Sequence, residues 1–217
     1  KVNKSQLTIE RIYSSPSLNG KTPKSLKISP DGSRVTYLQG KSNDLARYDL
    51  WEYNLQSKEN KLLVDSQVLF NGTEALSDEE KARRERQRIY GFGIMEYSFS
   101  SDGKALLFPL NGDIYYYHLA DKVAKRLTQT NGFETDIKFS PKGSYVSFIR
   151  AQNIFVIEIT TGKETQLTKD GLGLIKNGMS EFVAQEEMDR MTGYWWSPNE
   201  KHIAFLRIDE TPVQTVI

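Results

Sequence analysis

The sequence predicts an all-β fold, a partial β-propeller made of four-stranded antiparallel blades. Two observations predict it: a short turn-forming segment that recurs along the chain, and a constant spacing between the strands that follow each copy. We call the recurring segment the turn box. Its four copies are Ile28–Gly32, Phe99–Gly103, Phe139–Gly143 and Trp196–Glu200.

Each turn box is followed by segments typical of strands. In the box, proline presets φ, aspartate or asparagine bonds to its own backbone, and glycine takes a left-handed position. The runs that follow are rich in aromatic and β-branched residues. The first strands after the boxes are expected at Arg34–Leu38, Ala105–Pro109, Tyr145–Ile149 and His202–Leu206. The next strands are expected at Asp49–Leu55, Asp113–Leu119 and Asn153–Ile159, and the last ones end near Leu63, Thr128 and Thr168.

The spacing of these strands favours a propeller over other all-β folds. Ser100 and Ser140 lie 40 residues apart, a length typical of one four-stranded blade. A β-sandwich with similar turns is the alternative, but sandwiches do not repeat in sequence at a fixed period. A second interval is 14 residues in all three copies: Asp49 to Leu63, Asp113 to Leu127 and Asn153 to Leu167.

Two intervals between turn boxes are longer than one blade. Ser29 and Ser100 are 71 residues apart, and Ser140 and Ser197 are 57 apart. The excess predicts helical insertions at 68–90 and 170–192, in loops, where binding residues tend to be placed. We therefore expect blade repeats starting near residues 25, 95, 135 and 193, within one propeller portion that spans residues 1–217.

Composition excludes several classes of function. The net charge of +1, from 29 basic and 28 acidic side chains, lacks the basic excess of a nucleic-acid surface. There is no cysteine, and His118 and His202 do not have metal-ligand spacing, so we expect no metal or other cofactor. No apolar run is long enough to span a membrane. The chain opens without an initiator methionine or a signal peptide, which indicates a trimmed or mature chain from which an export signal could have been removed.

The first insertion reads as a basic helix. Ser77–Glu80 has the pattern of a capping box, and strong helix formers follow it. Arg84 and Arg88 are four residues apart and are expected to share a helix face. Three interpretations remain open: a solvated basic helix, an arginine that points into the propeller cavity and meets an anion, and an RNA-binding helix, for which interleaved aromatic residues are missing.

The second insertion carries two adjacent carboxylates, Glu186 and Glu187. Ser180 is expected to cap a helix over about residues 181–190. Neighbours on a helix diverge by about 100°, so both glutamates can serve one ligand only near a helix end or where the ligand lies across the turn. The alternative is two solvated glutamates on a polar helix. Apolar contacts are expected from Phe182, Val183 and Met188.

Two segments carry a resemblance to a known family. Gln185–Arg190 and Gly193–Pro198 are similar, position by position, to the double-glutamate motif and the Trp-Trp-Ser-Pro blade start of the dipeptidyl peptidase IV family, which belongs to the prolyl oligopeptidase clan of serine peptidases. The segment Arg84–Ile89, followed by Gly93 and Ile94, also resembles the arginine-bearing segment of some members. The resemblance runs from about Leu7 to the end of the chain.

The resemblance implies a role for each of these residues. Glu186 and Glu187 would hold the free α-ammonium of a peptide substrate, and Arg88, or Arg84 as second choice, would help to place the substrate carbonyl and the glutamates. The family propeller has eight blades, of which this chain would form about four. Chemistry would occur in a separate C-terminal α/β-hydrolase domain with a Ser-Asp-His triad. No Gly-x-Ser-x-Gly sequence occurs here, so this chain alone is expected to be inactive.

The resemblance also implies substrates, partners and a compartment. Family members remove N-terminal dipeptides with Pro or Ala as the second residue. Expected partners are peptides with a free N-terminus, the hydrolase domain of the same protein, and a second copy in a full-length homodimer. A periplasmic or secreted location is expected. The competing hypotheses are a non-catalytic propeller scaffold that binds a protein, and a related oligopeptidase or acylaminoacyl peptidase without the amine anchor.

Overall fold

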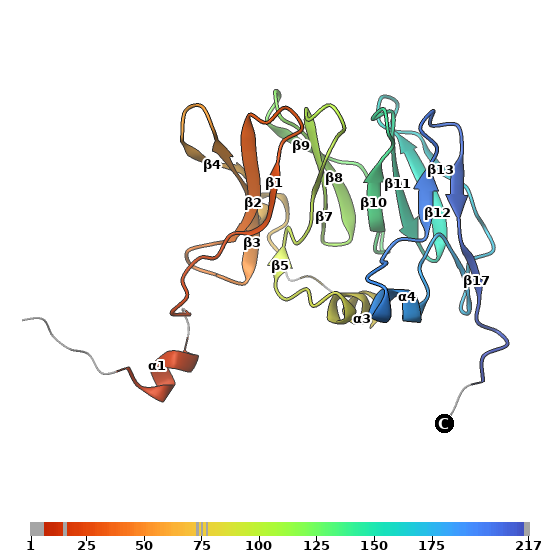
Figure 1. Ribbon diagram of the computed structural model, residues 1–217, viewed down its shortest axis with the longest axis horizontal. Coiled ribbons are helices and arrows are strands. Elements are labelled where there is room, and N and C mark those ends of the chain that lie inside the picture. The colour runs from red at the N-terminus through yellow and green to blue at the C-terminus, as the bar shows by residue number, and fades with distance from the viewer. Residues whose placement is uncertain (1–6, 15–16, 73, 75, 77, 215–217) are drawn as a thin grey trace, which may run out of the picture.

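The computed structural model describes residues 7–14, 17–72, 74, 76 and 78–214. Within these ranges the chain forms antiparallel sheets that stand side by side along the long axis of the molecule (Figure 1). Three of them are blades in which four strands pair in sequence order, and strands of a fourth blade follow. The predicted all-β, partial propeller architecture is confirmed.

Strands of the three blades follow one pattern. The first blade contains β1 (Lys24–Ile28), β2 (Arg34–Gly40), β3 (Arg47–Asn54) and β4 (Asn60–Val64), and the short β5 (Phe92–Gly93) pairs in parallel with the start of β3. The second contains β6 (Ser98–Phe99), β7 (Ala105–Leu110), β8 (Asp113–His118) and β9 (Val123–Arg126). The third contains β10 (Thr135–Phe139), β11 (Tyr145–Arg150), β12 (Asn153–Glu158) and β13 (Glu164–Gln166).

The fourth blade consists of two strand pairs. β15 (Tyr194–Trp196) pairs with β16 (Ile203–Phe205), as the fourth turn box predicts. β14 (Ile175–Asn177) pairs with β17 (Arg207–Asp209) and lies inside the second insertion, where the sequence predicted helix. Its three residues show no strand pattern of their own, because the pairing depends on a partner that is distant in sequence.

A serine organises each turn box, and it is buried in the first three copies. Its hydroxyl oxygen accepts a hydrogen bond from the backbone N–H five residues later, at 3.2, 3.0, 2.8 and 3.0 Å for Ser29, Ser100, Ser140 and Ser197. In three copies the hydroxyl also donates to the Asp or Asn two residues later, at 2.5 to 2.7 Å. The third copy has a lysine there, and Glu200 of the next box accepts the N–H of that lysine at 2.6 Å.

The last strand of the second and third blades ends earlier than predicted. β9 ends at Arg126 and β13 at Gln166, before Leu127–Thr128 and Leu167–Thr168 respectively. The threonines serve a different purpose, because their hydroxyls accept backbone N–H groups of the neighbouring strand. Thr128 accepts from Ile114 at 2.9 Å, and Thr168 accepts from Ile154 at 3.0 Å.

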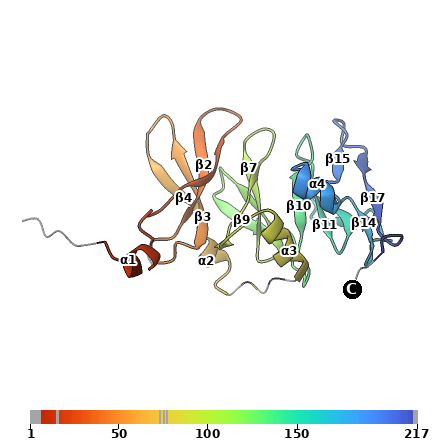
Figure 2. The same cartoon turned by 60° about the horizontal axis from the view of Figure 1, so that its bottom comes forward.

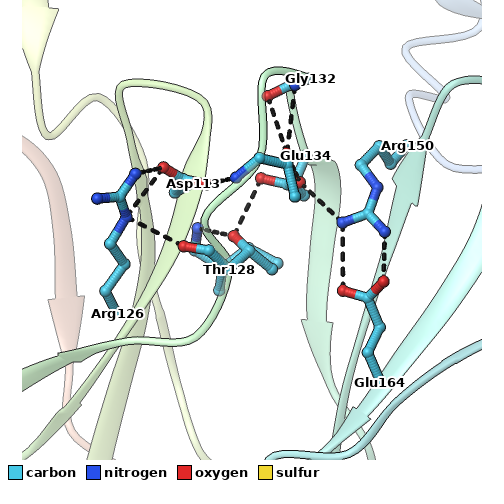
Figure 3. A network of polar contacts seen from close by, with 9 residues as sticks. Asp113, Arg126, Thr128, Gly132, Glu134, Arg150 and Glu164 are labelled. Carbon is cyan, nitrogen blue, oxygen red and sulfur yellow. Dashed lines mark hydrogen bonds and ion pairs between the residues drawn. The ribbon is translucent and has the colours of Figure 1, made fainter.

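A polar seam joins the second and third blades (Figure 3). Asp113 is buried and pairs with Arg126. Glu134 is also buried; it accepts hydrogen bonds from Thr128 at 3.1 Å and from the Arg150 guanidinium at 3.2 Å. Burial nevertheless raises the pKa of Glu134 above its usual value, because desolvation outweighs these bonds.

The apolar core lies between the sheets. Alternate residues of a strand point to opposite faces, so Leu106 and Phe108 of β7 pack toward the first blade, whereas Leu107 packs toward the third. A third cluster joins the third blade to Tyr194, which is fully buried. The second and third blades are therefore held by contacts on both of their faces.

The helices are shorter than the sequence predicted. The two insertions contain α3 (Asp78–Arg86) and α4 (Phe182–Glu187), while α1 (Ile9–Tyr13) and α2 (Ser66–Leu69) were not predicted. Ser77, the expected cap of α3, lies outside the described residues. Within the described ranges, none of the helices has the length and apolar character needed to cross a membrane.

The expected capping and packing of α4 were wrong. Its N-cap residue is Glu181, and the Ser180 hydroxyl is buried without a hydrogen-bond partner among the described residues. The physical reason is that the chain turns into the helix one residue later than the pattern indicated. The side chains that were expected to pack are exposed: Phe182, Val183 and Met188.

We predict that Ser100→Ala destabilises the protein by about 1–2 kcal/mol, because the buried N–H of Ala105 loses its acceptor. The measurement is the free energy of unfolding in urea. Ser57→Ala, at an exposed position with no side-chain hydrogen bond among the described residues, is the matched control and should change stability by less than about 0.5 kcal/mol. Equal effects of the two substitutions would contradict the role of the turn-box serine.

Candidate functional site

The two helical insertions meet at one end of the blades. In Figure 1, α3 and α4 lie below the sheets, and in Figure 2 that end comes forward. Both helices precede the first strand of a blade, whereas the turn boxes follow that strand, so the boxes lie at the opposite end. The Arg86 Nε donates a hydrogen bond to Gln185 Oε1 at 2.8 Å, which joins residues 99 positions apart.

A cavity of about 590 Å³ opens between these helices and the loops of the second and third blades. Most cations on its wall are already paired with a carboxylate. Arg83 lies 2.7 Å from Glu80, and Lys176 lies 2.7 Å from Glu210. Among the described residues, no group of three or more His, Asp or Glu side chains could hold a metal ion. The wall combines apolar and polar groups, including Arg86, Phe133, Asp136, Arg150, Met179 and Gln185.

The predicted arginine Arg84 is engaged in a buried ion-pair network. Its Nε donates to Glu80 Oε1 at 2.8 Å, and its Nη2 lies 2.9 Å from Glu74 Oε2. The second contact is an ion pair whose angles fall outside hydrogen-bond geometry. Both carboxylates are almost fully buried. Arg84 thus fixes α3 to the segment that precedes it.

The other predicted arginine, Arg88, is exposed and lies beyond the end of α3. The expectation that Arg84 and Arg88 share a helix face was wrong, because the helix terminates between them. The N–H of Ile89 donates to the carbonyl of Arg84 at 2.8 Å, and that of Arg88 donates to Glu85 at 3.0 Å. These two bonds form a Schellman motif, in which Arg88, with φ of +52°, takes the position usually given to glycine.

Glu186 and Glu187 occupy the last turn of α4 and are exposed. They do not line the cavity, and within the described part of the chain neither forms a hydrogen bond or an ion pair. The partial negative charge at a helix C-terminus disfavours carboxylates there. Phe182 and Val183 lie one turn earlier on the same exposed face, because residues four apart are neighbours on a helix.

The end of the second insertion is anchored to the third blade. The Lys138 ammonium lies 3.1 Å from Asp136 and 2.9 Å from the carbonyl oxygen of Tyr194, and it also donates to the Thr192 hydroxyl. Burial raises the pKa of Asp136 and lowers that of Lys138. The Tyr194 hydroxyl donates to the backbone carbonyl of Asp136 at 2.5 Å. These contacts hold the chain that returns from α4.

The resemblance implied that the arginine-bearing segment and the glutamate segment act together, but the hydrogen bond between Arg86 and Gln185 was not predicted. Arg86 lies within the arginine-bearing segment and Gln185 immediately precedes the glutamates, yet neither was singled out. No pattern in the sequence links two residues 99 positions apart.

Comparison with known proteins identifies the family. The family model of the dipeptidyl peptidase IV N-terminal region matches residues 94–217. The chain belongs to this family. The matched region includes Glu186 and Glu187, while α3 and its arginines precede it.

Relatives of this family member agree with the assignment. Human dipeptidyl peptidase 8 is 33% identical over 141 residues, which cover 56% of the chain and 16% of the human protein. The probable dipeptidyl peptidase 4 of Aspergillus clavatus is 39% identical over 79 residues, covering 36% of the chain and 10% of the fungal protein. The chain therefore matches less than a fifth of the length of these relatives.

A solved structure supports the fold of this family member. The crystal structure of Porphyromonas gingivalis dipeptidyl peptidase 4 aligns with a TM-score of 0.62 and 24% identity, over 88% of this chain and 26% of that one. At this level of identity the similarity concerns the fold. It agrees with a propeller region built of successive four-stranded blades.

We predict that Arg84→Met loosens the first insertion by about 1–3 kcal/mol, because Glu74 and Glu80 would remain buried with fewer donors. The measurement is the rate of proteolysis within residues 78–90. Lys81→Met, which removes an exposed ion pair from the same helix, is the control and should leave the rate nearly unchanged. Equal rates for both variants would contradict a structural role for Arg84.

Proposed function

We propose that the full-length protein is a serine-type dipeptidyl peptidase and that this propeller part selects its substrates. Glu186 and Glu187 bind the free α-ammonium of a peptide. The observation that carries the proposal is the position of the two carboxylates: adjacent, exposed, without a partner among the described residues, and at the helix end that disfavours negative charge. A bound cation relieves that cost.

An ammonium group suits this pair chemically. It has three N–H donors and must be compensated when it leaves water. Each charge-assisted hydrogen bond to a carboxylate contributes about 1.5–3 kcal/mol. Because α4 ends at Glu187, a ligand at the helix end can reach both side chains although they diverge along the helix. An acylated N-terminus has no such charge and binds weakly.

The glutamate pair determines which peptide bond of the substrate is cleaved. The amine is held at a fixed distance from a nucleophile in the C-terminal hydrolase domain, so the second peptide bond, and not the first or third, meets it. That domain supplies the Ser-Asp-His triad and performs the acyl transfer. This chain's contribution is binding and orientation, which raise the rate by placing the scissile bond.

Arg88 is the arginine that we assign to the substrate carbonyl, with Arg84 as the second choice. Arg88 is exposed, whereas the guanidinium of Arg84 is occupied by Glu74 and Glu80. A non-glycine residue in a left-handed conformation costs about 1–2 kcal/mol.

The first test is hydrolysis by the full-length protein of Gly-Pro-nitroanilide and its N-acetyl form, with wild type and Glu187→Ala. We expect wild type to cleave the free-amine substrate at least about a hundredfold faster than the acetylated one, the loss expected for one or two charge-assisted bonds. Glu187→Ala should abolish most of that preference.

The other outcomes would assign a different function to the protein. Equal cleavage of both substrates by wild type would indicate an oligopeptidase or acylaminoacyl peptidase. Cleavage of neither substrate would favour the non-catalytic scaffold that binds a protein partner.

A second test separates function from stability at Arg88. Arg88→Gly should stabilise the protein by up to about 1 kcal/mol, because glycine takes the left-handed position without strain. The same variant should lower kcat/KM for Gly-Pro-nitroanilide about tenfold or more, the cost of one bond to a charged group. Stability is measured by urea unfolding. A variant that is more stable and fully active would exclude Arg88 and leave Arg84.

A further inference from the structure

The helix that carries the glutamate pair has few stabilising interactions of its own. α4 is six residues long, its N-cap residue makes no side-chain capping bond, and its only buried residue is Ala184. Isolated helices of this length are not stable in water. Its orientation must therefore come from contacts with the rest of the protein.

One side chain of α4 makes such a contact. Gln185 accepts from Arg86 Nε at 2.8 Å and donates through Nε2 to the carbonyl of Ser180 at 2.7 Å. Among the described residues, no other side chain of α4 forms a hydrogen bond or an ion pair. The orientation of the amide follows from its partners, because a guanidinium only donates and a carbonyl only accepts.

This contact holds Gln185 on the face of α4 that is directed toward α3. On a helix, successive side chains are rotated by about 100°. With Gln185 fixed on the face toward α3, Glu186 and Glu187 follow on the exposed face. A small rotation of α4 would move both carboxylates together.

Arg86 differs from the other cations around the cavity in the partner of its side chain. Arg83, Arg150 and Lys176 each have a carboxylate within ion-pair distance. Within the described residues the partner of Arg86 is a neutral amide instead. A neutral partner leaves the negative charge of the site to the two glutamates, while the bond to Arg86 remains charge-assisted.

We infer that the Arg86–Gln185 hydrogen bond positions Glu186 and Glu187 for the substrate amine. Arg86 and Gln185 are positioning residues, which act through α4 and do not touch the substrate. The inference rests on the proposed function, since it concerns the same site. The inference adds a contact between α3 and α4 that is not part of the roles proposed for Glu186, Glu187 and Arg88.

The kinetic test uses the full-length protein and Gly-Pro-nitroanilide. Arg86→Met, which keeps the aliphatic stem and removes the donors, should lower kcat/KM about tenfold, mainly through KM, as expected for one charge-assisted bond. Gln185→Met should do the same, and the double variant should be no worse than either single one. Arg86→Lys should restore part of the loss. Arg207→Met, which breaks an exposed ion pair with Asp170, is the matched control and should leave kcat/KM unchanged.

Two further measurements separate positioning from direct binding and from general damage. In a Glu187→Ala background, Arg86→Met should change kcat/KM by less than about twofold, because its effect passes through the glutamates. Amide hydrogen exchange over residues 181–188 should accelerate in Arg86→Met and not in Arg207→Met. The thermal midpoint of the whole protein should stay the same.

The outcomes distinguish this inference from the proposed function. If Glu187→Ala reduces activity but Arg86→Met changes neither exchange nor kinetics, the inference is overturned and the proposed function stands. If the effects of Arg86→Met and Glu187→Ala multiply, Arg86 binds substrate directly, and the inference is again overturned. If Glu187→Ala has no effect, the pair binds no amine, and both fail.

Discussion

The second and third blades of this propeller bury apolar side chains on both of their faces, so the stability of each depends on a neighbouring blade on either side. Along β7, Leu106 and Phe108 serve one interface and Leu107 serves the other. At about 25 cal/mol for each Å² of apolar surface removed from water, these interfaces are the main stabilising contribution. Stacking in this way also aligns the strand ends of successive blades. The loops of different blades are therefore gathered at two rims, and insertions that are far apart in sequence meet on one of them.

Buried polar groups make the rim rigid enough to hold a site. The turn-box serines fix the far rim, and the seam of Asp113, Glu134 and Arg150 joins the second and third blades near the insertions. Tyr194 and Lys138 then hold the returning end of the second insertion against β10. Because an unpaired buried polar group costs about 1–3 kcal/mol, each of these networks favours one arrangement of the loops over its alternatives.

The candidate site itself is composed of locally unfavourable features. Two carboxylates end a short helix, and an arginine takes a left-handed position at the end of another. Natural sequences depart from such local preferences mainly where function requires it. The favourable interactions of the rim offset these costs, and a peptide ammonium at the glutamates would remove one of them.

The sequence by itself determined the repeated blade, its strands and the location of both insertions, because turns and alternation are short-range properties that recur at a fixed period. Charge marked the glutamate pair and the basic segment, and the resemblance to the dipeptidyl peptidase IV family gave them their expected roles. The tertiary structure decided what short-range patterns do not encode. Ser180 does not cap α4, β14 pairs with a strand 30 to 34 positions away, and Thr128 and Thr168 accept N–H groups from a neighbouring strand. Above all, the contact between Arg86 and Gln185 exists because the second, third and fourth blades lie side by side and bring together the insertions that precede the second and the fourth. Such a contact depends on packing between distant residues, and no local preference of either residue specifies it.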